Sequence, residues 1–222
     1  MRAAAYTIMK TNPPSLHFEQ SLWQSGLNRV AGFDEAGRGA MAGPVAVGAV
    51  ILPPGPHLAR TLAGVRDSKQ MTRPQRETWA ARIKSVALAW RVDFSSAEEI
   101  DQLGIVSATR LAATRALENL SILPDYLLLD FRIELPESPL PQTAIVKGDQ
   151  ISLSVAAASV LAKTSRDALM CGMDGQYPGY GLEQNKGYGT QIHRSAMVRL
   201  GYSPVHRKSF SLSVRVVKTK TR

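Results

Sequence analysis

Residues 29–52 of this chain read RVAGFDEAGRGAMAGPVAVGAVIL, and this stretch says most about the fold. An apolar entry ends in two adjacent acids, a glycine-rich turn follows, and a β-rich run extends from Val45 to Leu52. Apolar runs on both sides of a glycine turn are typical of two consecutive strands. The stretch therefore predicts a strand, a tight turn and a second strand.

The segments around this stretch add helices and further strands. Thr72 to Gln75 and Ser96 to Glu99 have the spacing of a capping box, which starts a helix. Hydrophobic spacing predicts helices over 15–25, 107–120 and 151–170, strands over 87–94, 126–130 and 143–146, and a helix-and-loop part from 187. Strands come first and then alternate with helices, so we expect an α/β fold in which helices flank a mixed β-sheet. No linker-like stretch divides the chain, which favours one domain.

The charge of the chain is concentrated at one end. The 222 residues include 27 Lys and Arg against 18 Asp and Glu, a formal net charge of +9. Residues 1–185 hold 18 of each sign, whereas the last 37 residues hold nine basic and no acidic side chains. A basic C-terminal part indicates a polyanionic partner. The composition, 44% hydrophobic and 20% charged, argues against disordered, collagen-like and membrane-spanning chains.

Cysteine usage and the N-terminal residues indicate the compartment. Cys171 is the one cysteine, which excludes an intramolecular disulfide and a cysteine-based zinc site. The apolar run over residues 3–9 is interrupted by Lys10 and is too short for an export signal. No stretch approaches the roughly eighteen apolar residues of a membrane span. We therefore expect a soluble cytoplasmic protein.

Four acidic residues stand where a strand ends or a glycine turn begins: Asp34, Glu35, Asp130 and Asp149. If the strand is regular, the adjacent pair points to opposite faces of the sheet, so one of the two would be buried. Carboxylates gathered from separate strands without histidines are a magnesium or manganese ligand set. Each also has a simpler interpretation: Asp149 as a helix N-cap, Asp130 as an Asx-turn residue, and the pair as a solvated loop.

Gly37, Arg38 and Gly39 follow the acidic pair directly and, with Ala42, match a dinucleotide-binding fingerprint. That fingerprint needs the glycines to open a helix, whereas here Gly43-Pro44 leads into a strand. A turn that exposes backbone beside acids suits close approach to a nucleic-acid sugar-phosphate better. A plain hairpin turn with an exposed arginine is the alternative.

Seven short blocks, in order along residues 28–210, carry a family resemblance. They are VAGFDEAGRG at 30–39, DSK at 67–69 with RE at 76–77, LD at 129–130, KGD at 147–149, AAAS at 156–159 with AK and RD at 162–167, KGYGT at 186–190, and HRKSF at 206–210. In order and spacing they resemble the type 2 ribonucleases H, most closely the bacterial HII branch. Phe131 follows Asp130 where the family has a small residue, and Asn185 stands where a histidine usually precedes the lysine.

The resemblance implies a ribonuclease H-like mixed sheet flanked by helices, with a helical basic C-terminal part. It implies an endonuclease that cuts RNA paired with DNA, and cuts 5′ of single ribonucleotides embedded in duplex DNA, leaving 5′-phosphate and 3′-hydroxyl ends. The four acids look like ligands of two Mg²⁺ or Mn²⁺ ions, Gly37-Arg38-Gly39 like the turn that contacts the ribose 2′-hydroxyl, and Tyr188 like the ring that stacks at the junction with DNA. Roles in ribonucleotide excision repair and DNA replication, and a monomeric state, are the corresponding expectations.

The expected boundaries are an N-terminal extension with a short helix at 1–27, a catalytic domain at 28–210 and a basic tail at 211–222. The extension is too short for the additional domain of the sister HIII enzymes. Two other classes compete with the nuclease: a non-catalytic nucleic-acid-binding protein, which would not need the four acids, and a nucleotide-cofactor enzyme built on the glycine turn.

Basic and aromatic side chains complete the predicted site. Candidate phosphate contacts or partners of the acids are Lys69, Lys147, Lys163 and Arg166. For Lys163 and Arg166 the alternative is an ordinary helix-surface pair near Asp167, and for Tyr188 it is core packing. The four histidines, at 17, 57, 193 and 206, are scattered in loops or in the C-terminal part, so we expect surface or packing roles for them rather than catalysis.

Overall fold

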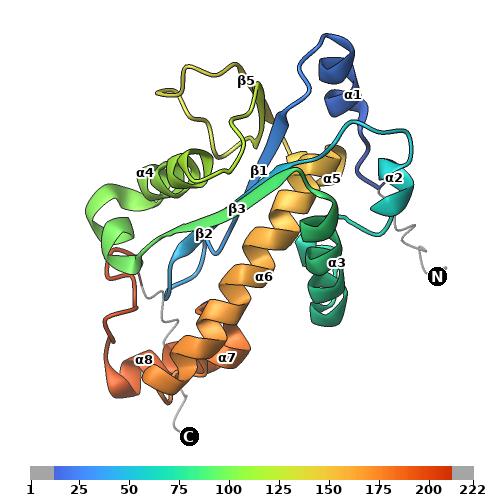
Figure 1. The fold of residues 1–222 in the computed structure, drawn as a ribbon. Coiled ribbons are helices and arrows are strands. Elements are labelled where there is room, and N and C mark those ends of the chain that lie inside the picture. The colour runs from blue at the N-terminus through green and yellow to red at the C-terminus, as the bar shows by residue number, and fades with distance from the viewer. Residues whose placement is uncertain (1–12, 212–222) are drawn as a thin grey trace, which may run out of the picture.

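A five-stranded mixed sheet lies at the centre of the computed structural model, which describes residues 13–211 (Figure 1). The strands are β1 (Val30–Ala36), β2 (Val45–Ile51), β3 (Ala89–Ser95), β4 (Tyr126–Asp130) and β5 (Gln142–Ile145). Their order in the sheet is β3-β2-β1-β4-β5. The first three strands form an antiparallel meander, whereas β4 and β5 run parallel to β1. The predicted α/β class is confirmed.

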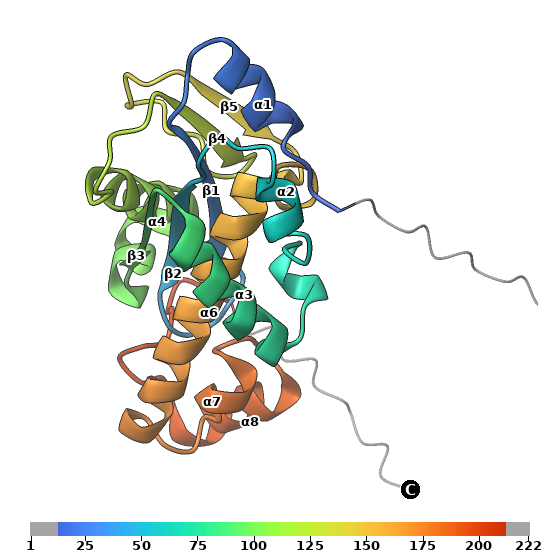
Figure 2. The same ribbon diagram turned by 45° about the vertical axis from the view of Figure 1, so that its right-hand side comes forward.

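The helices cover both faces of this sheet. They are α1 (His17–Gln24), α2 (Leu58–Thr61), the 3-10 helix η1 (Ser68–Gln70), α3 (Arg73–Val86), α4 (Ala97–Glu118), α5 (Gly148–Ile151), α6 (Leu153–Gln176), α7 (Leu182–Asn185) and α8 (Gln191–Leu200). The long helix α6 crosses one face with α3 beside it, and α4 lies on the other (Figures 1 and 2). Helices α7 and α8 pack near the far end of α6. No helix among the described residues is both long and apolar enough to cross a membrane.

Successive side chains of β1 point to opposite faces of the sheet, toward α4 or toward α6. Ala31 and Phe33 are buried in the cluster that packs against α4. Gly32 faces α6 so closely that an added Cβ would lie 2.3 Å from the Ser154 carbonyl carbon. Because side chains alternate along a strand, Asp34 is directed to the same side as Gly32. Helix α6 therefore lies almost in backbone contact with the strand that carries the acidic pair.

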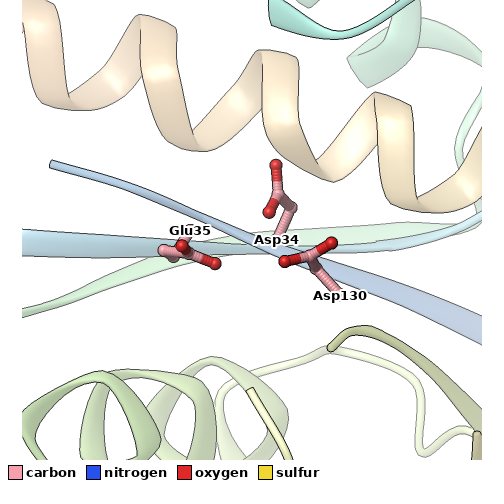
Figure 3. Close-up of side chains that lie close together, drawn as sticks. All are labelled: Asp34, Glu35 and Asp130. Atoms are coloured by element: carbon pink, nitrogen blue, oxygen red, sulfur yellow. The ribbon is translucent and has the colours of Figure 1, made fainter. Parts of the chain in front are cut away.

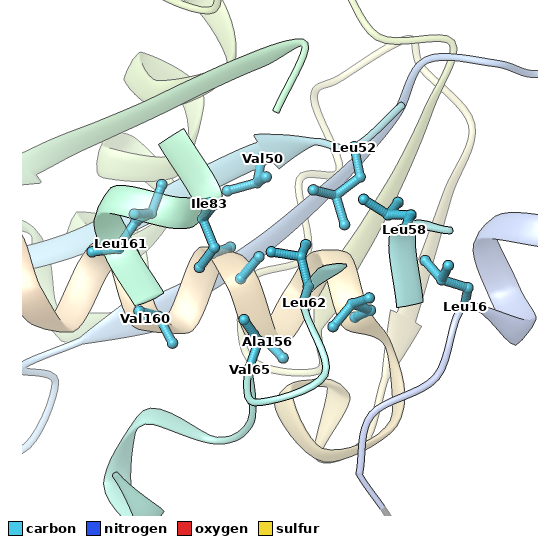
Figure 4. Packing of buried hydrophobic residues seen from close by; sticks show 14 of the residues in the cluster. Leu16, Val50, Leu52, Leu58, Leu62, Val65, Ile83, Ala156, Val160 and Leu161 are labelled. Atoms are coloured by element: carbon cyan, nitrogen blue, oxygen red, sulfur yellow. The ribbon is translucent and has the colours of Figure 1, made fainter. Parts of the chain in front are cut away.

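The hydrophobic core on the α6 side brings together segments far apart in the sequence. Leu62, Ile83 and Leu161 are fully buried there, with Val50 of β2 above them (Figure 4). Leu16, the N-cap residue of α1, adds to this side and is also buried. Burial of aliphatic side chains at this density is the main source of stability for a domain of this size.

Local signals in the sequence predicted most helix starts. Both capping boxes form, with the Thr72 and Ser96 hydroxyls accepting the amides of Gln75 and Glu99. Helix α4 begins at Ala97, as the Ser96 capping box predicted, and includes most of the helix predicted separately over 107–120; Gly104, at φ 76°, separates its two segments. Helix α6 begins at Leu153, where the Ser152 hydroxyl accepts the Val155 amide, and continues past the predicted end at 170.

The N-terminal helix α1 is tied to the start of α6 by a buried carboxylate. Glu19 is fully buried and accepts hydrogen bonds from the Ser152 hydroxyl at 2.6 Å and the Ser154 amide at 2.9 Å. A carboxylate is favourable at a helix N-terminus because the free amides and the helix dipole both attract it. Residues 1–12 and 212–222, which include most of the predicted basic tail, lie outside the described residues.

Candidate active site

Three of the four predicted acids lie together at the ends of two neighbouring strands (Figure 3). Asp34 and Glu35 belong to β1 and Asp130 ends β4. Because β1 and β4 are parallel neighbours with Phe33 opposite Leu129, Asp34 and Asp130 reach the same place at the sheet edge. One carboxylate oxygen from each of the three residues lies within 4.8 Å of the other two.

Burial and mutual repulsion make this cluster costly to ionise. Asp34 is only 3% exposed. Burial, and then the charge of Glu35, raise the pKa of Asp34 well above its usual value. Burial, and then the charge of Asp130, raise the pKa of Glu35. Asp34 confirms the prediction that one member of the adjacent pair is buried, and the charges of Arg38, Arg132 and Lys69 offset the rise in the pKa of Glu35 only in part.

The oxygen atoms of this cluster fit a hard divalent cation. Asp34 Oδ2 and Glu35 Oε2 are buried and have no hydrogen-bond partner among the described residues. An unpartnered buried carboxylate oxygen is unfavourable unless a cation or water meets it. Carboxylate oxygens are the ligands that Mg²⁺ and Mn²⁺ prefer. Asp34, Glu35 and Asp130 could thus hold a metal ion between β1, β4 and α6.

Asp149 lies next to this cluster in the first turn of α5, 6% exposed. It is not one of the three acids that approach within 4.8 Å. Its Oδ2 lies 3.6 Å from Lys69 Nζ. Burial, and then the charge of Asp67, raise the pKa of Asp149. Its carboxylate therefore stands between the cluster and the 67–69 segment.

The simpler interpretations of two acids are wrong. The alternative for Asp149 was the N-cap of a helix. In the structure Lys147, in the left-handed region at φ 55°, is the N-cap residue of α5 instead. The Asp130 side chain forms no Asx turn: its backbone carbonyl accepts the Ile133 amide of the turn at 2.9 Å, whereas its Oδ1 accepts the Gly148 amide, eighteen residues further on, at 3.1 Å. This bond fastens β4 to α5 and thereby orients the Asp130 carboxylate.

Asp67 is a buried carboxylate that the sequence interpretation did not include among the site residues. It is 6% exposed, caps η1 by accepting the Lys69 amide at 2.9 Å, and raises the pKa of Asp149. The Lys69 ammonium is exposed, and although burial lowers its pKa, the charges of Asp34, Asp67 and Asp149 raise it on balance. The DSK block at 67–69 was the sequence signal for this acid.

The glycine turn is held from behind by one buried guanidinium. Arg207 has no exposed surface and donates to the carbonyls of Gly37, Arg38 and Gly43 at 2.8, 2.8 and 2.9 Å. In a planar peptide the carbonyl and the following amide point in opposite directions. The amides of Arg38 and Gly39 therefore point away from Arg207, and no described residue accepts a hydrogen bond from either.

A second buried guanidinium, that of Arg166, joins this turn to the Tyr188 segment. It donates to the carbonyls of Pro44, Lys186 and Ala42 at 2.8, 2.9 and 3.1 Å. Burial lowers its pKa. A Cβ on Gly37 would lie 1.8 Å from Arg166 Nε, so this position, at φ 87°, admits only glycine.

The predicted basic contacts divide between surface and interior. Arg166 is fully buried, so the alternative of a helix-surface pair is wrong, and its donors face backbone carbonyls instead of solvent. Lys163 does form the helix pair, with Nζ 2.6 Å from Asp167. Lys69 and Lys147 are exposed near the acids and remain candidates for phosphate contacts.

Tyr188 lies at the surface, beside the glycine turn. It is 36% exposed, and its ring centroid is 5.5 Å from both Lys163 Nζ and Arg166 Cζ. The alternative of core packing is therefore wrong. The carbonyl of the preceding Gly187 accepts the amides of Met41 and Ala42, which joins the Tyr188 segment to the turn.

The two departures from the family pattern are accommodated without distortion of the acids. Phe131 is 55% exposed beside Asp130. Asn185 donates to the Tyr180 carbonyl and accepts the Gly187 amide, both at 2.7 Å, so it supports the segment that carries Tyr188. His193 and His206, for which surface or packing roles were expected, are both buried and in contact with each other.

Comparisons with known proteins agree on one family. The family model described as ribonuclease HII matches residues 31–213. Ribonuclease HII of Synechococcus sp. (strain JA-3-3Ab) is 57% identical over 92% of this chain and 91% of that protein. Ribonuclease HII of Thermus thermophilus is 50% identical over 87% and 91%.

Solved structures show the same fold. The crystal structure of ribonuclease H2 from Pyrococcus horikoshii OT3 superposes with a TM-score of 0.67, at 25% identity, over 82% of this chain and 93% of that one. Bst-RNase HIII, solved in complex with Mn²⁺, superposes with a TM-score of 0.63 at 20% identity, over 89% and 68%. The mixed sheet flanked by helices is common to these structures.

Proposed function

The chain belongs to the ribonuclease HII family and is a metal-dependent ribonuclease H, and from this we propose that it cuts 5′ of single ribonucleotides embedded in duplex DNA as well as the RNA strand of RNA–DNA hybrids. The observation that carries the proposal is the position of the glycine turn and Tyr188 on linked segments near the buried acids. The acids provide for hydrolysis, and the turn and the ring provide for selecting a ribose within DNA. Residues 28–210 would form this catalytic unit.

We propose that Asp34, Glu35, Asp130 and Asp149 together hold two ions, Mg²⁺ or Mn²⁺. Bound there, such ions would supply activation of a water, polarisation of the phosphate and charge stabilisation of the leaving oxygen. The chain orients the ligands: the Gly148 amide holds Asp130, and Lys69 lies 3.6 Å from Asp149. Hydrolysis with departure of the 3′ oxygen would leave 5′-phosphate and 3′-hydroxyl ends.

Recognition of the ribonucleotide follows from the direction of two peptide groups. A 2′-hydroxyl both donates and accepts, and it is what distinguishes RNA from DNA. The amides of Arg38 and Gly39 point outward, so they can donate to that hydroxyl without a side chain crowding the sugar. A Cβ on Gly39 would meet no atom of residues 13–211 within 4 Å, so a substrate could take that space. The ring of Tyr188 would stack beside the ribonucleotide, since aromatic rings stack on nucleic-acid groups without requiring one base.

The location of the charge supports a nucleic-acid substrate. Residues 186–222 carry nine basic side chains and no acidic one, in the same part of the chain as Tyr188. Cationic side chains contribute to phosphate binding in a salt-dependent manner. We propose that the protein acts as a monomer in the cytoplasm, in ribonucleotide excision repair and DNA replication.

Cleavage mapping on a labelled DNA duplex with one ribonucleotide tests this function. We expect a single cut 5′ of the ribonucleotide in Mg²⁺ or Mn²⁺, and no cut in the matched all-DNA duplex. Cleavage of a long hybrid without cleavage of this duplex would refute the single-ribonucleotide activity. Tight binding to both duplexes without any cleavage would instead indicate a non-catalytic nucleic-acid-binding protein.

A further inference from the structure

Two histidines form a buried contact behind Tyr188, away from the acidic cluster. His193 of α8 is 0% exposed and His206 is 1% exposed. Their Nε2 atoms lie 3.1 Å apart. At one end, His193 Nδ1 lies 3.0 Å from the Tyr188 carbonyl, and at the other, His206 Nδ1 lies 3.0 Å from the Ser203 amide and 2.7 Å from the Ser203 hydroxyl, which can also donate to it. Three contacts thus run in line from Ser203 to Tyr188.

The groups at the two ends determine where the protons are. A backbone amide can only donate, so His206 Nδ1 accepts from Ser203 and a neutral His206 carries its proton on Nε2. A carbonyl can only accept, so His193 carries its proton on Nδ1 and its Nε2 is bare. Both ends therefore require the same central bond, in which His206 Nε2–H donates to His193 Nε2. All three hydrogen bonds therefore form only when each donor points from Ser203 toward Tyr188 and both rings are neutral.

A second proton on either ring would break this line. A second proton on His193 would set two N–H groups against each other between the Nε2 atoms, and one on His206 Nδ1 would oppose the Ser203 amide and leave only the Ser203 hydroxyl to accept it. Besides His193 and the Ser203 hydroxyl, His206 faces two aromatic rings: Tyr180 and Tyr202 have ring centroids 4.6 and 5.8 Å away. Arg207, its neighbour in the chain, turns its guanidinium toward the glycine turn. Burial lowers the pKa of both histidines, that of His206 to about 4, so the pair is neutral at physiological pH.

This line of bonds ends on the peptide that carries the proposed junction-reading ring. Gly187, at φ 79°, precedes Tyr188 and Gly189 follows it; the bonds of Gly187 to Met41, Ala42 and Asn185 hold the peptide before Tyr188, but not the Tyr188 carbonyl. The Tyr188 carbonyl is held by His193 and by the Thr190 amide at 2.7 Å. Loss of the histidine donor would leave the carbonyl with a single local bond.

The same segment also holds the glycine turn. His206 pairs with Ala42 in a β-bridge, and the next residue, Arg207, binds the carbonyls of Gly37 and Arg38. The His206 side chain thus contacts Tyr188 through His193, and the Arg207 side chain binds the glycine turn. We propose that His193 and His206 are positioning residues: their one-directional pair sets Tyr188 at a fixed place relative to the glycine turn, and so sets the enzyme's preference for a single ribonucleotide in DNA. This inference rests on the proposed function of Tyr188.

Nitrogen-15 NMR of the imidazole rings tests the pair without any activity measurement. In the full-length protein at pH 7 we expect His193 as the Nδ1–H tautomer and His206 as the Nε2–H tautomer. The exposed His17 and His57 serve as internal references in the same spectrum. The opposite tautomer, or a positively charged ring, at either buried position would overturn the inference.

Kinetics of matched variants test the positioning itself. Because His193→Leu removes the donor, we expect KM for the single-ribonucleotide duplex to rise about tenfold, with kcat and the long-hybrid reaction within about twofold of wild type. His193→Asn places an amide donor near the position of Nδ1 and should restore KM to within about threefold of wild type. His57→Leu, at an exposed position, is the matched control and should change nothing.

A double variant separates this inference from the function on which it rests. If His193 acts through Tyr188, adding His193→Leu to Tyr188→Ala should change KM by less than about twofold, since coupled residues are not additive. Fully additive losses, or a His193→Asn protein as impaired as His193→Leu, would overturn the inference. Equal losses on both substrates from Tyr188→Ala alone would instead refute the junction-reading function. The NMR measurement of the two tautomers would still test the histidine pair in that case. Should His193→Leu fail to fold, His193→Asn and His206→Gln, which retains a donor toward His193, carry the same comparison.

Discussion

Replacing Arg207 by lysine should damage both stability and ribonucleotide recognition, because one guanidinium holds three carbonyls of the glycine turn. The side chain is fully buried and donates to Gly37, Arg38 and Gly43 at 2.8–2.9 Å. Burial lowers its pKa to about 9, so it keeps its charge at neutral pH. An ammonium is a point donor that lacks the guanidinium's planar fork. Lysine would leave one or two of these carbonyls without a partner.

The magnitude follows from the bonds lost. A hydrogen bond to a charged group contributes about 1.5–3 kcal/mol, and a buried carbonyl without a partner costs about 1–3 kcal/mol. Partial rebonding and local relaxation offset some of this, so we expect Arg207→Lys to lower the free energy of unfolding by about 2–4 kcal/mol. Because the outward amides of Arg38 and Gly39 depend on the same peptides, KM for a duplex with one ribonucleotide should rise about tenfold.

Urea denaturation and steady-state cleavage measure the two effects. Arg199→Lys on α8, at an exposed position, is the matched control and should stay within about 0.5 kcal/mol of wild type. If Arg207→Lys were as stable as Arg199→Lys and cut the duplex with an unchanged KM, the guanidinium would not be what holds the turn. The reasoning from carbonyl geometry to recognition would then be refuted.

Three other predictions follow from close contacts, burial and exposure. Gly32→Ala should lower the free energy of unfolding in urea by about 2–3 kcal/mol or more, because the added Cβ would lie 2.3 Å from the α6 backbone. The control Gly172→Ala should be neutral or stabilising, because its Cβ would have no atom of the described residues within 4 Å. Equal stabilities of the two variants would contradict this packing. The folded pKa of His206, about 4, lies below the ordinary 6.5, so its stabilising effect is full above pH 6.5 and is lost as pH falls toward 4, by at most about 3 kcal/mol. His206→Gln should flatten that part of the stability curve, and an unchanged slope would count against the neutral ring. Tyr188→Ala should impair cleavage of the single-ribonucleotide duplex more than cleavage of a long hybrid, and equal losses would contradict a junction-reading ring.

Features that depend on local sequence were predictable. The capping boxes at Thr72 and Ser96, and strand β4 with its bounds at Tyr126 and Asp130, follow from residue types a few positions apart. The meeting of Asp34 with Asp130 was also within reach, because acids at the ends of neighbouring strands meet at one edge of a sheet. These helix starts, this strand and this pair of acids can thus be predicted from local residue propensity and from position at a strand end.

The supports of the site were not predictable, since their partners are backbone groups far away in the chain. Arg166 and Arg207 bind carbonyls that lie between 20 and 170 positions distant, and a carbonyl has no residue type that a sequence could reveal. In the sequence, Arg166 is compatible with a helix-surface pair, and only packing against the glycine turn shows that it is buried. The contact of His193 with His206 depends in the same way on how α8 packs.

Manganese binding and cleavage, measured on the same samples of wild type and Asp34→Asn, test the central claim most directly. The claim is that the buried carboxylates at the ends of β1 and β4 hold the ions that hydrolyse the ribonucleotide linkage. It predicts that wild type binds Mn²⁺ in electron paramagnetic resonance titrations and cuts the single-ribonucleotide duplex, that EDTA abolishes cutting, and that Asp34→Asn binds the duplex but loses cleavage together with tight Mn²⁺ binding. Cleavage that survives EDTA, or an Asp34→Asn protein that turns over at the wild-type rate in saturating metal, would contradict it.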